Sequence, residues 1–413
     1  MLKETRNNAI IFNLCFFALA CSVSLDLLVK GYPEKIFYLV SYVAVTYIIL
    51  NTYKNPKILV SDKPLMLLCI SLIFFSASKL IWAELFKNTD FIDIRDNYHT
   101  VGKRFLLAAF VLFYFNQCRR MLNKNVLKVS IAALFIGLIM ALWLGYLSRT
   151  ELEPRVKWTT DAATTGAYLA VFISMISIIL IRKCFQSSVL SLLMFLGTFL
   201  ASMIMVLLTE TRAAIFLTPV LYLAFFLAYY RDVNKKIQAL FTVIIFTGAA
   251  TVLYFSWDRI SQIQTDIAEY HTNNDTSVGT RLSIWKSGWY SSQFNLLGQS
   301  TDKRYQKVEE YIRQHERGNL EAMRNVAYHL HNDMLETLSL QGMFGLFSLL
   351  CFYLFGLYFS LNRKNAFENS GTLFVICPVI VFGFTDVVLI QSNTALVVVT
   401  SLALSLPLLK RSY

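Results

Sequence analysis

Residues 189–208 read VLSLLMFLGTFLASMIMVLL, residues 209–212 read TETR, and residues 213–230 read AAIFLTPVLYLAFFLAYY. A helix needs roughly 20 apolar residues to cross about 30 Å of hydrocarbon. Each of the two apolar runs is close to that length, and the charged tetrapeptide between them is typical of a short loop at a membrane surface. This stretch therefore predicts a helical membrane protein.

The same pattern extends along the whole chain. Of its 413 residues 56% are hydrophobic and 15% are charged, which is far too apolar for an ordinary soluble domain. We expect a single all-α transmembrane domain over residues 1–413. The apolar runs predict twelve spans, at approximately 9–28, 36–51, 64–83, 101–117, 126–147, 163–181, 189–208, 213–230, 237–256, 335–361, 371–388 and 392–409.

The first run admits a second interpretation. Ala18-Leu19-Ala20-Cys21 loosely resembles the cleavage site of a lipoprotein signal peptide, whereas Asp26 and the eleven further spans favour a retained helix.

Eighteen of the 38 lysines and arginines cluster on alternate loops that carry only four acidic residues, which marks those loops as cytoplasmic. Both termini are then cytoplasmic, and residues 257–331 form one long periplasmic loop between the ninth and tenth spans. The net charge of +12 reflects this asymmetry and does not call for a nucleic-acid partner. The marking residues are Lys3, Arg6, Lys54, Lys57, Lys63, Arg119, Arg120, Lys124, Lys128, Arg182, Lys183, Arg231, Lys235, Lys236, Arg363, Lys364, Lys410 and Arg411.

Three residues at the predicted periplasmic surface carry chemistry. Arg212 lies between two spans, where a guanidinium is costly unless it is paired or useful, and it could pair with Glu210 or reach the surface. Arg281 lies in the long loop, which also contains a charged helical stretch from Asp302 to about Gln314. Two arginine forks suit a pyrophosphate whose negative charge grows as a glycosyl bond to it breaks. His331, where the loop re-enters the membrane, could accept the proton of an attacking hydroxyl.

A metal site is the competing possibility. Asp90, Asp93 and Asp96 recur every third residue in the outer loop after the third span, although a solvated helical face explains this spacing better. The chain has no Walker A loop, no glycine-rich dinucleotide turn and no His-Glu-x-x-His motif. Its seven cysteines imply no zinc site and no disulfide framework. We therefore expect no cofactor and no metal.

The motifs resemble those of the bacterial O-antigen ligases, in the wider group that includes the O-antigen polymerases. The family pattern is His, then Asn, Ser or Gln, nine residues, and Gly-x-x-Gly, and it matches His331-Asn332, nine residues, and Gly342-Met343-Phe344-Gly345 completely. Thr211-Arg212-Ala213 and Gly279-Thr280-Arg281-Leu282 match the family's two arginine motifs. The resemblance in span and loop placement covers essentially the whole chain.

The resemblance implies a GT-C-like glycosyltransferase that moves O-antigen from undecaprenyl pyrophosphate to lipid A-core at the periplasmic face of the inner membrane, without nucleotide or metal. It implies that His331, Arg212 and Arg281 are catalytic. Asp386 is similar to an acidic position near the family's last outer loop. The residues expected to bind substrate are Arg212, Arg281, Asn332, Gly342, Gly345 and Asp386.

Two rival functions remain. An O-antigen polymerase shares the architecture, although the histidine motif and the arginine pair favour a ligase. A transporter or flippase would explain twelve helices without catalysis, but it predicts functional charges at the membrane midplane and broken helices. The buried candidates Asp26 and Lys79 lie near span ends instead. The expected partners are the two lipid-linked substrates, membrane lipids and a second copy of the chain in a homodimer.

Overall fold

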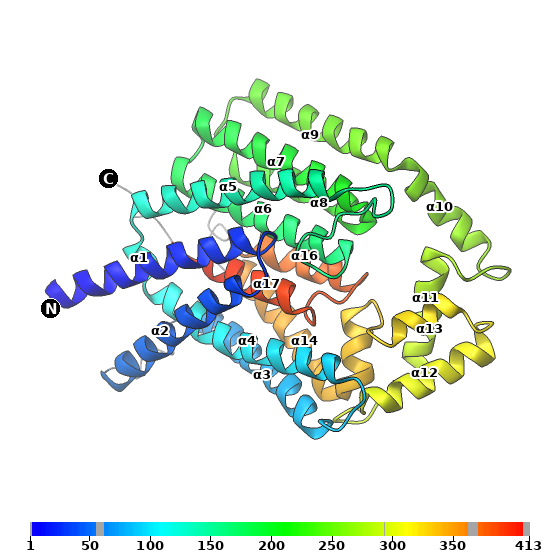
Figure 1. The fold of residues 1–413 in the computed structure, drawn as a ribbon. Helices are drawn as coiled ribbons and strands as arrows, with labels where there is room; N and C mark the ends of the chain where they lie inside the picture. Colours follow the sequence, from blue (N-terminus) through cyan, green and yellow to red (C-terminus); the bar gives the residue numbers. More distant parts are fainter. Residues whose placement is uncertain (1, 55–61, 293, 362–370, 408–413) are drawn as a thin grey trace.

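A computed structural model describes residues 2–54, 62–292, 294–361 and 371–407, and all regular structure in these ranges is helical (Figure 1). The marker residues Lys57, Arg363, Lys364, Lys410 and Arg411 lie outside the described residues. The helices are α1 (Leu2–Leu25), α2 (Tyr32–Lys54), α3 (Lys63–Leu85), α4 (Ile92–Gln117), the 3-10 turn η2 (Arg119–Met121), α5 (Lys124–Ser148), α6 (Ala163–Phe185), α7 (Val189–Thr209), α8 (Arg212–Tyr229), α9 (Lys235–Phe255), α10 (Trp257–Ala268), α11 (Ser277–Ser291), α12 (Thr301–His315), α13 (Leu320–Val326), α14 (Asp333–Leu361), α16 (Leu373–Gly383) and α17 (Ser392–Ser405).

Within the described ranges, nine helices are long and apolar enough to cross a membrane, namely α1, α2, α3, α5, α6, α7, α8, α9 and α14. The prediction of an all-helical polytopic membrane protein is therefore confirmed. Each of the three other predicted runs also overlaps a helix, but α16 and α17 are short and α4 begins with a charged first half. The number of twelve spans stays a prediction.

Helix α6 forms the centre of the bundle. Its membrane-length segment is 94% buried, against 17% for α9 at the edge, and it packs against α5, α7, α8, α16 and α17. A helix that is apolar on every face and buried on every face belongs to the interior of a bundle. Because these helices surround α6, its first turns lie close to the segments that join the surrounding helices to one another.

Two predicted boundaries are wrong. The span predicted for residues 371–388 ends at Gly383, because the chain turns there and directs Asp386 to polar partners. The fourth helix begins at Ile92 and not near residue 101, so Asp93 and Asp96 lie in its first turns, on the exposed helical face that we expected for them.

The segment predicted as the long loop folds into α10, α11, α12 and α13, which gather at one end of the bundle, away from the start of α1 (Figure 1). The helix expected from Asp302 to about Gln314 is confirmed as α12. Ile284, Val308, Ile312, Val326 and Leu330 form a small separate core between these helices.

Gly342 fixes this helical segment to the bundle. Its φ of +64° interrupts α14, and the next two backbone N–H groups donate to Asn295 and Leu296 at 2.9 and 3.0 Å. A Cβ at position 342 would lie 2.5 Å from the Asn295 carbonyl oxygen, so only glycine fits this approach. From the bundle side, the Trp82 indole donates to the Gln299 carbonyl at 2.9 Å.

Candidate active site

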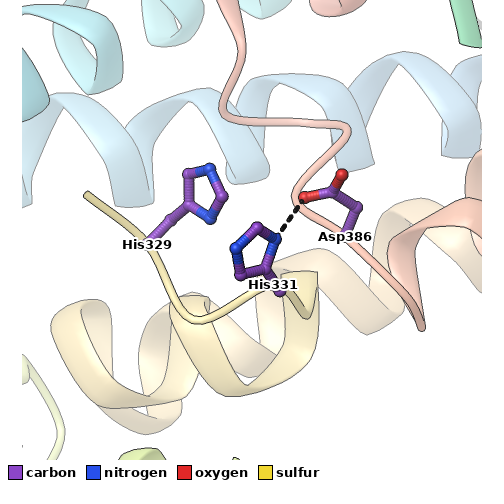
Figure 2. A group of neighbouring side chains, drawn as sticks. All are labelled: His329, His331 and Asp386. Atoms are coloured by element: carbon purple, nitrogen blue, oxygen red, sulfur yellow. Dashed lines mark hydrogen bonds and ion pairs between the residues drawn. The ribbon is translucent and has the colours of Figure 1, made fainter. Parts of the chain in front are cut away.

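His331 and Asp386 form a hydrogen-bonded pair at the start of α14. Nδ1 of His331 lies 3.1 Å from Oδ1 of Asp386, which comes from the connection between α16 and α17 (Figure 2). Nε2 of His331 lies 3.4 Å from Oδ1 of Asn325, a long contact. The side chain of His331 is 18% exposed and that of Asp386 is 4% exposed, so the imidazole alone keeps access from outside.

The backbone around His331 is held in an uncommon conformation. His331 has a φ of +50°, which costs free energy for a residue that carries a Cβ. The N–H of Leu330 donates to Oε2 of Glu336 at 2.8 Å, and the Trp285 indole donates to the His331 carbonyl at 3.3 Å. Asn332 caps α14 by accepting from the N–H groups of Met334 and Leu335, and its own amide donates to the Phe384 carbonyl at 3.0 Å. These contacts orient the imidazole toward Asp386.

Glu336 is itself fixed by a buried ion pair. Its Oε2 lies 2.7 Å from Nη1 of Arg304 on α12, and both side chains are fully buried. The Tyr98 hydroxyl donates to the other carboxylate oxygen at 3.3 Å. The histidine segment is thus tied to α12 on one side and to α4 on the other.

Asp386 is held as a carboxylate. Burial alone would raise the pKa of Asp386, but the hydrogen bond and charge of His331, with the nearby charges of His329 and Arg281, outweigh it and hold that pKa below its ordinary value. Its Oδ2 accepts from the Tyr168 hydroxyl on α6 at 3.3 Å, and its Oδ1 accepts from the Val387 N–H. A buried carboxylate in this position orients an imidazole and stabilises its protonated form.

Arg212 is the first residue of α8, directly after the turn that ends α7. Its three guanidinium nitrogens are buried and have no hydrogen-bond partner among the described residues. The suggested pairing with Glu210 is wrong, because that carboxylate contacts Arg149 at 3.4 Å and Arg259 at 3.9 Å instead. An unpaired buried guanidinium is costly, so it indicates a site for an anion.

Three further arginines lie near enough for their charges to act on Arg212, namely Arg155, Arg259 and Arg281. All four are half-buried, and we call them the arginine cluster. Burial first, and then the like charge of Arg259, lower the pKa of Arg155. Asp266 also acts on Arg212, but its Oδ2 already accepts from the Val278 N–H at 3.2 Å. The cluster suits a ligand with more than one negative charge, such as a diphosphate.

Arg281 connects the cluster to the histidine. Its charge acts both on Arg212 and on Asp386. Arg281 lies in the second turn of α11, whose first turn is capped by Thr276. The structure therefore brings the three residues predicted to be catalytic, together with Asp386, into one region built from α6, α8, α11 and α14.

Sequence reasoning did not find several members of this region. Arg155 and Arg259 lie in segments without a motif, and Tyr168 lies inside an apolar run. Asn332, Gly342 and Gly345 have visible packing roles here: a Cβ at position 345 would lie 2.8 Å from Oε1 of Gln341. Their predicted contact with substrate stays a prediction.

The group His329, His331 and Asp386 also offers three ligand atoms, all within 4.8 Å of one another (Figure 2). Such a group can in principle hold a divalent cation. Here, however, Nδ1 of His331 is directed at Asp386, so these two atoms contact each other. Asp90, Asp93 and Asp96 form no such group in the described part of the chain; Arg95 pairs with Asp96 at 2.9 Å, and the Asp90 N–H donates to Asp302.

Two comparisons with known proteins bear on this site. A family model described as O-antigen ligase matches residues 196–350, the stretch that contains Arg212, Arg281 and His331. A protein of Escherichia coli (strain K12) named O-antigen ligase is 26% identical over 415 residues, which cover 98% of this chain and 94% of that relative.

Proposed function

We propose that this chain, a member of the O-antigen ligase family, transfers O-antigen polysaccharide from undecaprenyl pyrophosphate to a sugar hydroxyl of lipid A-core at the periplasmic face of the inner membrane. The observation that supports this most strongly is the His331–Asp386 pair beside a cluster of arginines, one of which has no partner among the described residues. A base and an anion site are the two elements that glycosyl transfer from a diphosphate requires.

His331 acts as the base in this proposal. With the proton of the neutral imidazole on Nδ1, facing Asp386, the lone pair of Nε2 is free to take the acceptor's hydroxyl proton. The incoming hydroxyl replaces the long contact between Nε2 and Asn325. The positive charge that forms on the imidazole is stabilised by the Asp386 carboxylate.

The arginine cluster serves the other half of the reaction. The acceptor oxygen forms a bond to the anomeric carbon while the bond from that carbon to the phosphate oxygen breaks, and its electron pair leaves with undecaprenyl diphosphate. Arg212 and Arg281, with Arg155 and Arg259, stabilise the growing negative charge. Attack opposite the leaving group inverts the anomeric centre. The energy lies in the glycosyl-pyrophosphate bond, so neither ATP nor a metal is required.

We further propose that α4, α16 and α17 also cross the membrane, which gives twelve spans in one GT-C-like domain with both termini in the cytoplasm. The segment 257–331 is then periplasmic. The gathering of α10 to α13 at the end of the bundle away from the start of α1 supports this orientation (Figure 1). A second copy of the chain, in a homodimer, is a further proposed partner that cross-linking in membranes would test.

Reconstitution tests the proposal directly. Purified protein is mixed with undecaprenyl-linked O-antigen and lipid A-core, with and without a chelator, and with the His331→Ala variant as control. We expect the wild-type protein alone to form product, in chelator as well. No product from wild-type protein with both substrates present would refute the ligase assignment, and loss of product in chelator would refute metal independence.

A deletion strain separates the ligase from the polymerase. Loss of a ligase leaves lipid-linked polymer and bare core, whereas loss of a polymerase leaves a core capped by a single repeat. We expect the first result.

A further inference from the structure

A polar cavity of about 240 Å³ opens beside the site and takes no part in the reaction as described. Three connections form its walls, each together with the start of the helix that follows it: the segment between α1 and α2, the segment between α5 and α6, and the segment between α16 and α17. Helix α4 adds a further wall. The lining residues used below are Asp26, Glu34, Asn97, Thr159, Thr165 and Asn393.

The cavity lies one helical turn from the His331–Asp386 pair. Thr165, in its wall, belongs to the first turn of α6, and its hydroxyl donates to Oε1 of Gln391 at 3.0 Å. Tyr168, three residues further along the same helix, donates to Asp386 at 3.3 Å. Three residues make nearly one helical turn. The cavity and the Asp386 carboxylate therefore contact α6 at positions about one turn apart.

The charge of the cavity is opposite to that of the arginine cluster. Of the described residues that line it, only Lys30 is basic, and that side chain pairs with Asp161 at 3.6 Å. Glu34 is paired with the buried Arg104 behind the wall. Carboxylates, amides and threonine hydroxyls make up most of the remaining polar surface. Such a surface repels a diphosphate, but it offers both donors and acceptors to the hydroxyls of a sugar ring.

Asp26 provides the independent indication of a ligand. Its side chain lines the cavity and is only 4% exposed, and its Oδ2 has no hydrogen-bond partner within the described residues. Burial, partly offset by Arg104 and reinforced by Glu34, raises the pKa of Asp26 to about 7. A buried carboxyl oxygen without a partner costs free energy that a hydroxyl donor from a ligand would recover.

We propose that this cavity binds a neutral or amino sugar ring of the acceptor saccharide, adjacent to the ring whose hydroxyl His331 deprotonates. The proposal rests on the proposed transferase function. The volume of the cavity lies below the range of about 300 Å³ and more that drug-sized ligands occupy, so it suits a single sugar ring. The acceptor, and not the donor, fits here because an inverting attack brings the hydroxyl from the side opposite the diphosphate, which the arginine cluster holds.

Binding to a catalytically inactive protein tests the cavity without turnover. Labelled, delipidated core oligosaccharide from the same bacterium is titrated onto the His331→Ala protein, and onto the same protein carrying Asp26→Asn or Asn393→Ala. The matched control is Asp96→Asn, an exposed carboxylate one residue from the cavity wall that pairs with Arg95. We expect about tenfold weaker binding for each cavity variant and unchanged binding for the control.

Kinetics of the active protein give the second readout. Asp26→Asn and Asn393→Ala should raise KM for lipid A-core about tenfold and leave KM for the undecaprenyl-linked donor unchanged. The cavity proposal would be overturned if Asn393→Ala and a folded Asp26→Asn bound the oligosaccharide as well as the parent protein does. A rise in KM for the donor in place of the acceptor would overturn it too. If Asp26→Asn does not fold, Asn393→Ala, which changes a lining residue from another segment, decides. A wild-type protein that binds the oligosaccharide but transfers nothing would refute the proposed transferase function and leave the cavity supported.

Discussion

The His331–Asp386 pair and the arginine cluster lie in one region but are built in opposite ways. The pair is tied down by contacts from Tyr168, Glu336 and the cap of α14. The guanidinium of Arg212 has none within the described residues. A base must be oriented before its substrate arrives, whereas a cation that binds an anion must keep its donors free for it. In the proposed reaction, the site therefore separates a rigid proton acceptor, His331, from an unsatisfied anion receptor, the arginine cluster.

The largest expected effect comes from the His331–Asp386 pair. We expect His331→Ala to reduce transfer by about 10³- to 10⁴-fold, because it removes the group proposed to take the hydroxyl proton. In a deletion strain that expresses the variant, lipopolysaccharide should carry no O-antigen while the protein reaches the membrane in normal amount. Normal smooth lipopolysaccharide would contradict the role of this histidine.

The second largest effect is expected in the arginine cluster. Arg212→Ala is expected to lower kcat/KM by about 10²- to 10³-fold, since one donor to the leaving diphosphate is removed. Arg212→Lys keeps the charge but loses the planar fork, so it should recover only part of the activity. Arg231→Ala, an exposed arginine, serves as the matched control for loss of a positive charge. Equal activity of Arg212→Ala and this control would remove Arg212 from the reaction.

Asp386→Asn tests whether orientation matters apart from the base itself. The amide keeps the shape but loses the charge that stabilises the protonated imidazole, so we expect kcat to fall by about 10²-fold. The KM for the donor should change little, because the arginine cluster is intact. Unimpaired kcat at neutral pH would show that the hydrogen bond to His331 is structural only.

Glu336→Gln weakens a contact that holds the backbone beside His331. It leaves Arg304 buried without its carboxylate, which should cost about 3 to 5 kcal/mol of stability. We expect a clear drop in Tm in detergent and about tenfold lower kcat, because the Leu330 N–H loses a charged acceptor. The double variant Glu336→Gln, Arg304→Met should regain Tm but not kcat. Recovery of both would show that Glu336 affects stability only.

The smallest effect concerns His329, which contacts the ring of His331 edge to face at 4.3 Å between centroids. Burial first, then the charge of His331, lowers the pKa of His329 to about 4. Between that value and the unfolded value of about 6.5 the unfolded chain binds the proton and the native site does not, so stability falls as pH falls. Wild-type Tm should therefore decrease from pH 6.5 to 4.5, and His329→Gln should decrease less. Parallel curves would contradict this.

Much of the architecture could be predicted from local patterns. The apolar run at residues 189–208 gives α7, and the run at 163–181 gives α6, because hydropathy over about 20 residues decides whether a segment prefers lipid. The end of the eleventh run was missed, since Asp386 follows an apolar run and its neighbours could not show that its partner is His331. Arg212, Arg281 and His331 were found through motifs.

The sequence by itself determined that the chain is a bundle of membrane helices with a structured segment before α14, and which three side chains to suspect. Only the tertiary structure decided that Asp386, 55 residues after His331, is its partner, that Arg155 and Arg259 join the cluster, and that Arg212 is unpaired. The physical reason is range: partition into lipid is a property of a continuous segment, whereas hydrogen bonds and charge clusters depend on which helix ends the packing of the bundle brings together.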